Sequence, residues 1–287
     1  MKPGAFEYHR VRSVDEAVSL LTQLGGDAKL LAGGQSLVGM MNFRLARPAA
    51  LIDVSRVDTL RYCTLVGNEL RIGALTSHRE IERLDDPFVT ERFSVLPRSA
   101  HWIGHYAIRT VGTFGGSIAH ADPAAEWCML ALLLDAEVVA VGPGGERVIP
   151  VGRFFTGFLE TDLADDEMLT EVRFPTPWPY AALHEFSRRH GDFAIVAAAA
   201  AVQMTDNRCT DARIVVGGVD STVIRLAEAE KVLSGGTIDG DALDEAAAVA
   251  ARAVDPPDDL NGSAAYRCHL TGVLVKRALE EAIARAA

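Results

Sequence analysis

Two pairs of adjacent glycines constrain this chain more than any other feature of its sequence. Gly33-Gly34 directly follows an apolar run in LLAGGQSLVG, and Gly115-Gly116 lies within TVGTFGGSIAH. Glycine inside a helix or strand is destabilising by about 0.5–1 kcal/mol relative to alanine, so such pairs indicate positions where bare backbone is needed. Both pairs are therefore expected to form tight turns with positive φ, whose N–H groups can approach an anion closely.

The residues around the two pairs are also alike. Gln35 and Ser36 follow the first pair and Ser117 follows the second, and their side chains add hydrogen-bond donors. Two such turns facing each other would hold a pyrophosphate from both sides. Neither has the G-x-G-x-x-G spacing of a Rossmann fold or the G-x-x-x-x-G-K-[ST] spacing of a P-loop. A dinucleotide bound in another way and two ordinary tight turns both stay open at this point.

The hydrophobic pattern predicts an α+β chain. Ser13 with Glu16, and Ser77 with Glu80, have the spacing of capping boxes that begin helices. Short strands are predicted in AKLLAGG, AALIDVSRV and ELRIGALT, and AAEWCMLALLLDAEVVAVG predicts a helix that runs into a strand before the hairpin turn GPGGER. The two element types therefore alternate in the first part of the chain.

A proline-rich segment indicates a domain boundary. Pro175, Pro177 and Pro179 alternate in EVRFPTPWPY, and proline withholds the N–H that a sheet needs, so a strand should end there in an extended connection. We expect domains at 1–178 and 179–287. In the second, DFAIVAAAAAVQM and DARIVVGGV predict a β-hairpin, although the alanine run also fits a helix. Three helices should follow, the last from Ser263 onward.

Charge and composition exclude several classes of partner. The formal net charge of −11 argues against nucleic acid, whose binding depends on Lys and Arg that neutralise phosphates. No apolar run approaches the roughly 18–20 residues that span a bilayer, and the first residues lack the apolar core of a secretion signal. We therefore expect a cytoplasmic protein without a transmembrane segment.

No metal site is predicted in this chain. The four cysteines are scattered singly, without the C-x-x-C spacing of zinc or iron–sulfur sites. His101, His105 and His120 gather near the second glycine pair, but no Cys or Glu supports them at ligand spacing. Contact with a cofactor or a partner is the favoured interpretation of these histidines.

Two long segments resemble a known family. AGGQSLVGMMNFRLARPAALIDVSRV and WIGHYAIRTVGTFGGSIAHADPAAEW are similar to the signature segments of the FAD-binding medium subunit of molybdenum hydroxylases, the carbon monoxide dehydrogenase and xanthine dehydrogenase group. EFSRRHGDFAIVAAAAAV and RIVVGGVDSTVIRLAEAE resemble its C-terminal domain. The resemblance implies an α+β fold. A two-part FAD-binding domain of the p-cresol methylhydroxylase and vanillyl-alcohol oxidase type, with subdomains at about 1–58 and 59–178, precedes a smaller domain with an antiparallel sheet and helices.

The same resemblance implies which residues contact FAD. It places the first phosphate loop at 32–36 with two flanking leucines, and the second at 113–117. Carboxylates contact the adenosine half, and two apolar residues and a histidine lie near the flavin. The implied residues are Leu31, Ala32, Gly33, Gly34, Gln35, Ser36, Leu37, Ile103, Thr113, Phe114, Gly115, Gly116, Ser117, Asp122, Glu126, Leu169 and His184. His184 stands where xanthine dehydrogenases have a lysine, which argues against NAD as the acceptor.

The function implied by the resemblance is electron transfer. An iron–sulfur small subunit with [2Fe-2S] clusters would pass electrons to FAD in this chain, and a large subunit would hold the molybdopterin-type molybdenum cofactor, in a dimer of heterotrimers. The external acceptor would be NAD, oxygen or a quinone. No catalytic residue is assigned to this chain. The alternatives are a self-sufficient FAD-dependent oxidase of the same fold and a flavin-free scaffold subunit.

Overall fold

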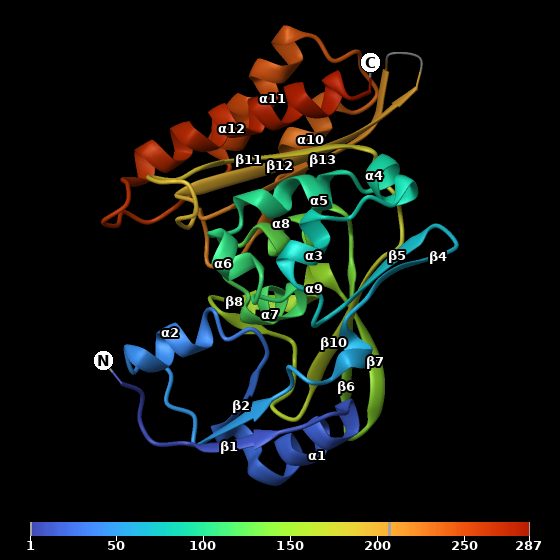
Figure 1. Ribbon diagram of the computed structural model, residues 1–287. Coiled ribbons are helices and arrows are strands. Elements are labelled where there is room, and N and C mark those ends of the chain that lie inside the picture. Colours follow the sequence, from blue (N-terminus) through green and yellow to red (C-terminus); the bar gives the residue numbers. More distant parts are fainter. Residues whose placement is uncertain (1, 206–207, 287) are drawn as a thin grey trace.

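Three hydrophobic cores follow one another along the molecule in the computed structural model, which describes residues 2–205 and 208–286 (Figure 1). The first core belongs to the N-terminal lobe, the second to the middle of the chain and the third to the C-terminal sheet with its helices. Helices and antiparallel sheets together confirm the α+β class predicted from the sequence.

The N-terminal lobe is a small parallel sheet with one helix against it. Its strands lie in the order β1 (Glu7–Arg10), β3 (Ala50–Asp53), β2 (Ala28–Leu31), and α1 (Val14–Leu24) packs on them. The predicted capping box of α1 is half formed. Ser13 Oγ accepts from the Glu16 N–H at 3.2 Å, but the Glu16 carboxylate accepts from the N–H of Arg12 at 2.7 Å instead. The short helix α2 (Leu37–Asn42) follows β2.

The middle of the chain is built on an antiparallel sheet with short helices beside it. The strand order is β4 (Cys63–Val66), β5 (Glu69–Gly73), β10 (Met168–Phe174), β6 (Glu137–Gly142), β7 (Gly145–Pro150). The helices are α3 (His78–Glu82), α4 (Pro87–Arg92), α5 (Val95–Ser99), α6 (Tyr106–Arg109), α7 (Phe114–His120), α8 (Glu126–Leu133) and α9 (Val151–Phe154), with the small strands β8 (Phe155–Gly157) and β9 (Glu160–Thr161). The predicted helix, strand and hairpin turn between Glu126 and Pro150 are confirmed.

The C-terminal sheet resolves the ambiguity of the alanine run. Residues 196–205 form β12 (Val196–Thr205), between β11 (Tyr180–Phe186) and β13 (Arg208–Gly217), with β14 (Ile224–Arg225) at the edge. Alternate alanines point to opposite faces of the sheet: Ala197 and Ala199 enter the middle core and Ala198 enters the C-terminal core. Because both faces are covered, every position is apolar and the two-residue period of a strand is hidden.

The two faces of this sheet are covered by different parts of the chain. In Figure 1, α10 (Ala227–Leu233), α11 (Gly240–Arg252) and α12 (Ala264–Ala284) lie over the outer face, and these are the three helices expected from the sequence. The inner face packs on α5 and α8 of the middle part. Helix α8 is buried along almost its whole length, so it joins the C-terminal sheet firmly to the middle core. Among the described residues, no helix combines the length and the apolar character that crossing a membrane requires.

Candidate functional site

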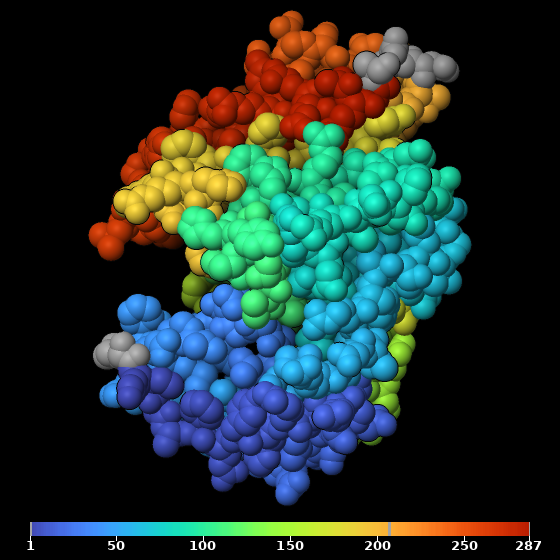
Figure 2. All heavy atoms as spheres, viewed as in Figure 1, coloured from blue at the N-terminus to red at the C-terminus, as the bar shows by residue number. Residues whose placement is uncertain are grey.

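A cavity lies between the N-terminal lobe and the rest of the molecule. Its volume is about 690 Å³, within the range of roughly 300–1,000 Å³ that is usual for ligand sites. Figure 2 shows the molecule hollowed between the N-terminal lobe, in dark blue, and the green middle part. The walls come from the end of β2 and the loop after it, from 103–126, from 156–169 and from the loop 191–193. Both glycine segments predicted from the sequence border this cavity.

The first segment, Gly33 to Leu37, is an open loop between β2 and α2. Gly34 has φ +67°, so its backbone is in the left-handed region that favours glycine. Gly33 has a different constraint, because a Cβ there would lie 2.3 Å from the carbonyl oxygen of Val111. The loop is fastened by Gln35, whose Nε2 donates to the Gly33 carbonyl at 2.9 Å. The positive φ predicted for the first glycine pair is confirmed at Gly34.

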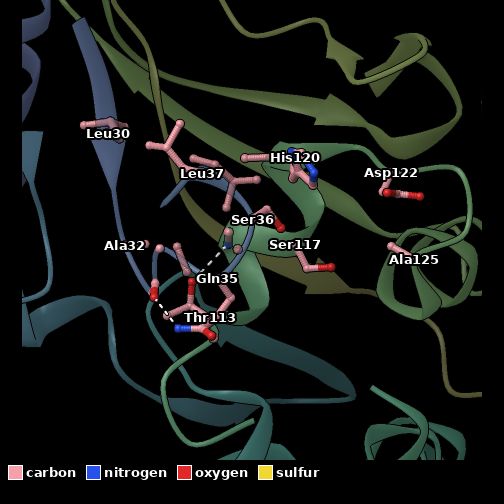
Figure 3. A pocket seen from close by; sticks show the side chains of 18 of the residues that line it. Leu30, Ala32, Gln35, Ser36, Leu37, Thr113, Ser117, His120, Asp122 and Ala125 are labelled. Atoms are coloured by element: carbon pink, nitrogen blue, oxygen red, sulfur yellow. Dashed lines mark hydrogen bonds between the residues drawn. The ribbon is translucent and has the colours of Figure 1, made fainter. Parts of the chain in front are cut away.

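The backbone N–H groups of this first segment are free to bind a ligand. Within the described part of the chain, the five consecutive amides from Gly33 to Leu37 have no hydrogen-bond acceptor. Successive N–H groups in a loop of this kind form a concave site for an anion. In Figure 3 the Gln35 amide turns back toward the Gly33 carbonyl, and Ser36, Ser117 and Asp122 are other residues of the cavity wall.

The second segment, Thr113 to Ser117, has a different structure from the one predicted. It is the first turn of α7, and neither Gly115 nor Gly116 has positive φ, so the expectation of a second tight turn is wrong. Its amides from Phe114 to Ser117 are occupied: for example, Gly115 N–H donates to the Ala74 carbonyl at 2.9 Å and Gly116 N–H to Thr113 Oγ1 at 3.2 Å. Gly115 is needed for packing, because a Cβ there would lie 2.6 Å from Ala74 Cα.

The two segments nevertheless meet. The Cβ position of Gly33 lies 2.8 Å from Gly112 Cα, so the first loop rests directly on the residues before the second segment. Only two bare backbones can approach this closely. The predicted juxtaposition of the two glycine segments is therefore present, although they meet as a loop against a helix start.

Two carboxyl groups line the same cavity beyond α7. Asp122 accepts from the Ala124 N–H at 2.8 Å, which fixes its side chain in the turn before α8. Glu126 is the first residue of α8. Burial, together with the nearby charge of Asp122, raises the pKa of Glu126 to about 7. The cavity thus has one carboxyl group that changes charge near neutral pH.

Most of the residues implied by the resemblance lie on the cavity wall. The apolar ones include Ile103 and Leu169, both nearly buried. The residues brought together are Leu31, Ala32, Gly33, Gly34, Gln35, Ser36, Leu37, Ile103, Thr113, Gly115, Gly116, Ser117, Asp122, Glu126 and Leu169.

Two of the implied residues lie elsewhere. Phe114 is fully buried in the middle core and packs against Trp127 with ring centroids 5.1 Å apart. His184 lies outside the cavity wall, on the face of β11 that α12 covers, and its Nε2 is 2.6 Å from a carboxylate oxygen of Glu281. The side-chain alternation of β11 explains this position, since a residue two places from Ala182 points to the same C-terminal core.

One residue on the cavity wall, His78, was not predicted from the sequence. His78, the first residue of α3, borders the cavity but is only 5% exposed. Trp127 Nε1 donates to His78 Nδ1 at 2.9 Å. The two residues are far apart in the sequence, and His78 has no motif spacing, so only the fold brings them together.

Comparison with known proteins agrees with this geometry. Residues 4–177 match the family described as the FAD binding domain in molybdopterin dehydrogenase, and residues 181–282 match the CO dehydrogenase flavoprotein C-terminal domain. The 6-hydroxypseudooxynicotine dehydrogenase complex subunit alpha of Paenarthrobacter nicotinovorans is 41% identical, over 100% of this chain and 97% of its own. The carbon monoxide dehydrogenase medium chain of Hydrogenophaga pseudoflava is 38% identical over the full length of both.

A solved structure matches the whole fold. A chain of the Hydrogenophaga pseudoflava carbon monoxide dehydrogenase, in a form that lacks the Mo-pyranopterin moiety of its molybdenum cofactor, superimposes with a TM-score of 0.96. The match covers 100% of both chains at 38% identity. The resemblance seen in the sequence is confirmed over the entire chain.

Proposed function

The chain belongs to the family of FAD-binding medium subunits of molybdenum hydroxylases, a family of oxidoreductases, and from this we propose that it is the electron-transfer subunit of such a complex. In this role it takes electrons from [2Fe-2S] clusters of a small subunit and passes them to an external acceptor. A large subunit with the molybdenum cofactor hydroxylates the substrate, and two heterotrimers form the whole assembly.

One observation carries the assignment of the cofactor site. The five unpartnered amides from Gly33 to Leu37 form an anion site on the wall of a cavity of dinucleotide size. The pyrophosphate of FAD is the anion that such a site fits, and backbone donors hold it without a buried cation. Gly34 at positive φ and the bare Gly33 keep these amides accessible. The second segment contributes the Ser117 hydroxyl and close packing, since its amides from Phe114 to Ser117 are occupied.

The remaining walls fit the two ends of the cofactor. Asp122 and Glu126 offer carboxylate oxygens that can accept from ribose hydroxyls. Ile103 and Leu169 offer apolar contacts to the flavin ring and exclude water from it. When bound, FAD supplies the ability to accept electrons singly and to release two together. The residues of this chain therefore bind and orient the cofactor, and none has to act as a nucleophile or general base.

The names of the relatives support an assembly. One relative is a subunit of a dehydrogenase complex and another is the medium chain of carbon monoxide dehydrogenase. We also propose the domain division 1–178 and 179–287, supported by the separate C-terminal core and by the two family matches on either side of residues 178–180.

The experiment that tests this function is purification at native abundance, with co-purifying chains identified by mass and the visible spectrum recorded. The proposal expects flavin bands overlaid by iron–sulfur absorption and two partner chains. Flavin bands from a lone chain that bleach on addition of a small substrate would replace the proposal by a self-sufficient oxidase. A colourless chain that still holds both partners would replace it by a scaffold.

A further inference from the structure

His78 packs against Gly112, which lies just before the second glycine segment and touches the first. Its backbone N–H donates to the Gly112 carbonyl at 3.1 Å, and a Cβ at Gly112 would lie 2.7 Å from His78 Nε2. Gly112 in turn contacts Gly33 of the anion-binding loop. The imidazole therefore lies one residue layer from the loop that we assign to the pyrophosphate, and it borders the same cavity.

Trp127 fixes the tautomer of this imidazole. The indole nitrogen carries a hydrogen and can only donate, so His78 Nδ1, at 2.9 Å from it, must accept with its lone pair. The hydrogen of the neutral ring then sits on Nε2. Protonation at Nδ1 would set two N–H groups against each other, so the indole also disfavours the cation.

The surroundings keep His78 neutral. Burial is the main cause and the charge of Arg109 the second, and together they lower the pKa of His78 to about 4. Arg109 is itself held by Glu82 at 3.1 Å and by the Gly104 carbonyl at 2.9 Å, so this positive charge has a fixed position. At neutral pH His78 is thus a neutral donor with a defined direction.

The Nε2–H group of His78 makes no hydrogen bond to the described residues. His78 borders the cavity and is 5% exposed, and its Nε2 is not one of the fully buried polar atoms without a partner, so this donor can reach an acceptor inside the cavity. We propose that His78, oriented by Trp127, donates its Nε2–H to a phosphate oxygen of the dinucleotide held by the Gly33–Leu37 loop. This inference rests on the proposed function, because it takes FAD as the ligand of that loop.

Nitrogen NMR of the full chain labelled with ¹⁵N-histidine tests the inference without any change at the site. His78→Gln identifies the His78 resonances. We expect the neutral Nε2–H tautomer in the flavin-free protein, and a shift of the Nε2 resonance when FAD is added. A cationic ring, a hydrogen on Nδ1, or an Nε2 resonance that FAD leaves unchanged would overturn the proposal.

Three variants test the donor itself through the dissociation constant of FAD, followed by flavin fluorescence. His78→Phe removes the donor and should weaken FAD binding about tenfold or more, whereas His78→Gln keeps an N–H near the Nε2 position and should restore most of the affinity. Trp127→Phe removes the indole N–H that fixes the tautomer of His78, and it should weaken FAD binding to an intermediate extent. His269→Gln, exposed on α12, is the matched control.

The outcomes separate this inference from the proposed function. Equal affinity of His78→Phe and the wild type, or equal loss in the Gln and Phe variants, would overturn the role of His78 and leave the FAD assignment intact. Failure of the wild-type chain to bind FAD would instead overturn the proposed function. Thermal melts of each variant identify any that fail to fold. In that case the NMR measurement on the wild type decides whether His78 Nε2–H contacts FAD.

Discussion

The two glycine segments are nearly alike in sequence and differ in what their glycines do. In Gly33 to Leu37 the glycines keep five amides free and allow positive φ. In Thr113 to Ser117 they lie in the first turn of α7, where the amides are already paired and Gly115 allows Ala74 to pack against the helix. We therefore expect the first segment to bind the cofactor, while the residues just before the second segment, Val111 and Gly112, support the first loop.

This difference shows that a glycine pair has to be interpreted by the hydrogen bonds of its amides. The absence of a Cβ serves three separate purposes here: a left-handed backbone at Gly34, a backbone contact at Gly33 and helix packing at Gly115. Substitutions should therefore affect cofactor binding at one segment and folding at the other, and the following changes test that distinction.

The largest effect is expected from Gly33→Val. Its Cβ would overlap the Val111 carbonyl oxygen, so the first loop must move away and lose several of its amide contacts. The affinity for FAD should fall about a hundredfold or more. Flavin titration measures it, and Gly39→Ala, where a Cβ would meet nothing within 4 Å, is the control. Full flavin occupancy in Gly33→Val would contradict the role of the first segment.

Gly115→Ala should act on stability. A Cβ there would meet Ala74 backbone at 2.6 Å, and overpacking of this kind costs about 1–3 kcal/mol. Urea unfolding of the flavin-free protein should show this loss, while the folded variant keeps FAD affinity within a few-fold of the wild type. If Gly115→Ala leaves the stability unchanged but loses FAD, Gly115 serves cofactor binding and not folding.

A carboxyl group on β11, outside the cavity wall, should also make stability depend on pH. Burial and the charge of Glu126 raise the pKa of Glu185 on β11 to about 8, and both of its carboxyl oxygens lack a partner among the described residues. In the folded protein the Glu185 carboxyl group stays protonated up to about pH 8, whereas in the unfolded chain it loses its proton near the ordinary pKa of about 4.5. Stability should therefore fall by about 2–4 kcal/mol as pH rises from 5 to 8.

Glu185→Gln should remove most of that pH dependence in urea unfolding at the two pH values. Glu91→Gln, at an exposed carboxyl on α4, should leave it unchanged. An equally steep decline in both variants would show that Glu185 does not cause it.

Thr113→Ala is expected to have a smaller effect. Thr113 Oγ1 caps α7 by accepting from Gly116 N–H, and loss of such a cap costs about 1 kcal/mol. Differential scanning calorimetry should detect this loss, and Thr113→Ser should restore it because the hydroxyl is kept. If serine destabilises the protein as much as alanine does, the cap is not the reason.

The smallest effect is expected from Gln35→Ala. Its amide fastens the first loop through one exposed hydrogen bond to the Gly33 carbonyl, which is worth about 0.5 kcal/mol. The affinity for FAD should fall about two- to threefold in flavin titration, with the melting temperature unchanged. A change in stability without a change in affinity would assign Gln35 to folding instead.

Much of the fold could be predicted because local signals decide it. Ser77 and Glu80 form the full capping box that their spacing indicates, and Pro175, Pro177 and Pro179 separate β10 from β11. The strand at 196–205 could only be left open, since a strand covered on both faces has no alternation in the sequence.

The site was harder to predict where contacts are long-range. The resemblance located most of the cavity wall, but Gly115 and Gly116 could be assigned to a helix only once Thr113 was seen to cap it. The hydrogen bond between Trp127 and His78 joins α8 to α3, which no spacing in the sequence encodes. His184 faces α12 because of the register of β11.

A crystal structure of the full chain with FAD would locate the pyrophosphate through the distances from its oxygens to the backbone nitrogens of the first segment. We expect several of these oxygens at about 2.7–3.2 Å from the amide nitrogens between Gly33 and Leu37. A pyrophosphate bound away from this loop, with those five amides still unpartnered, would contradict it.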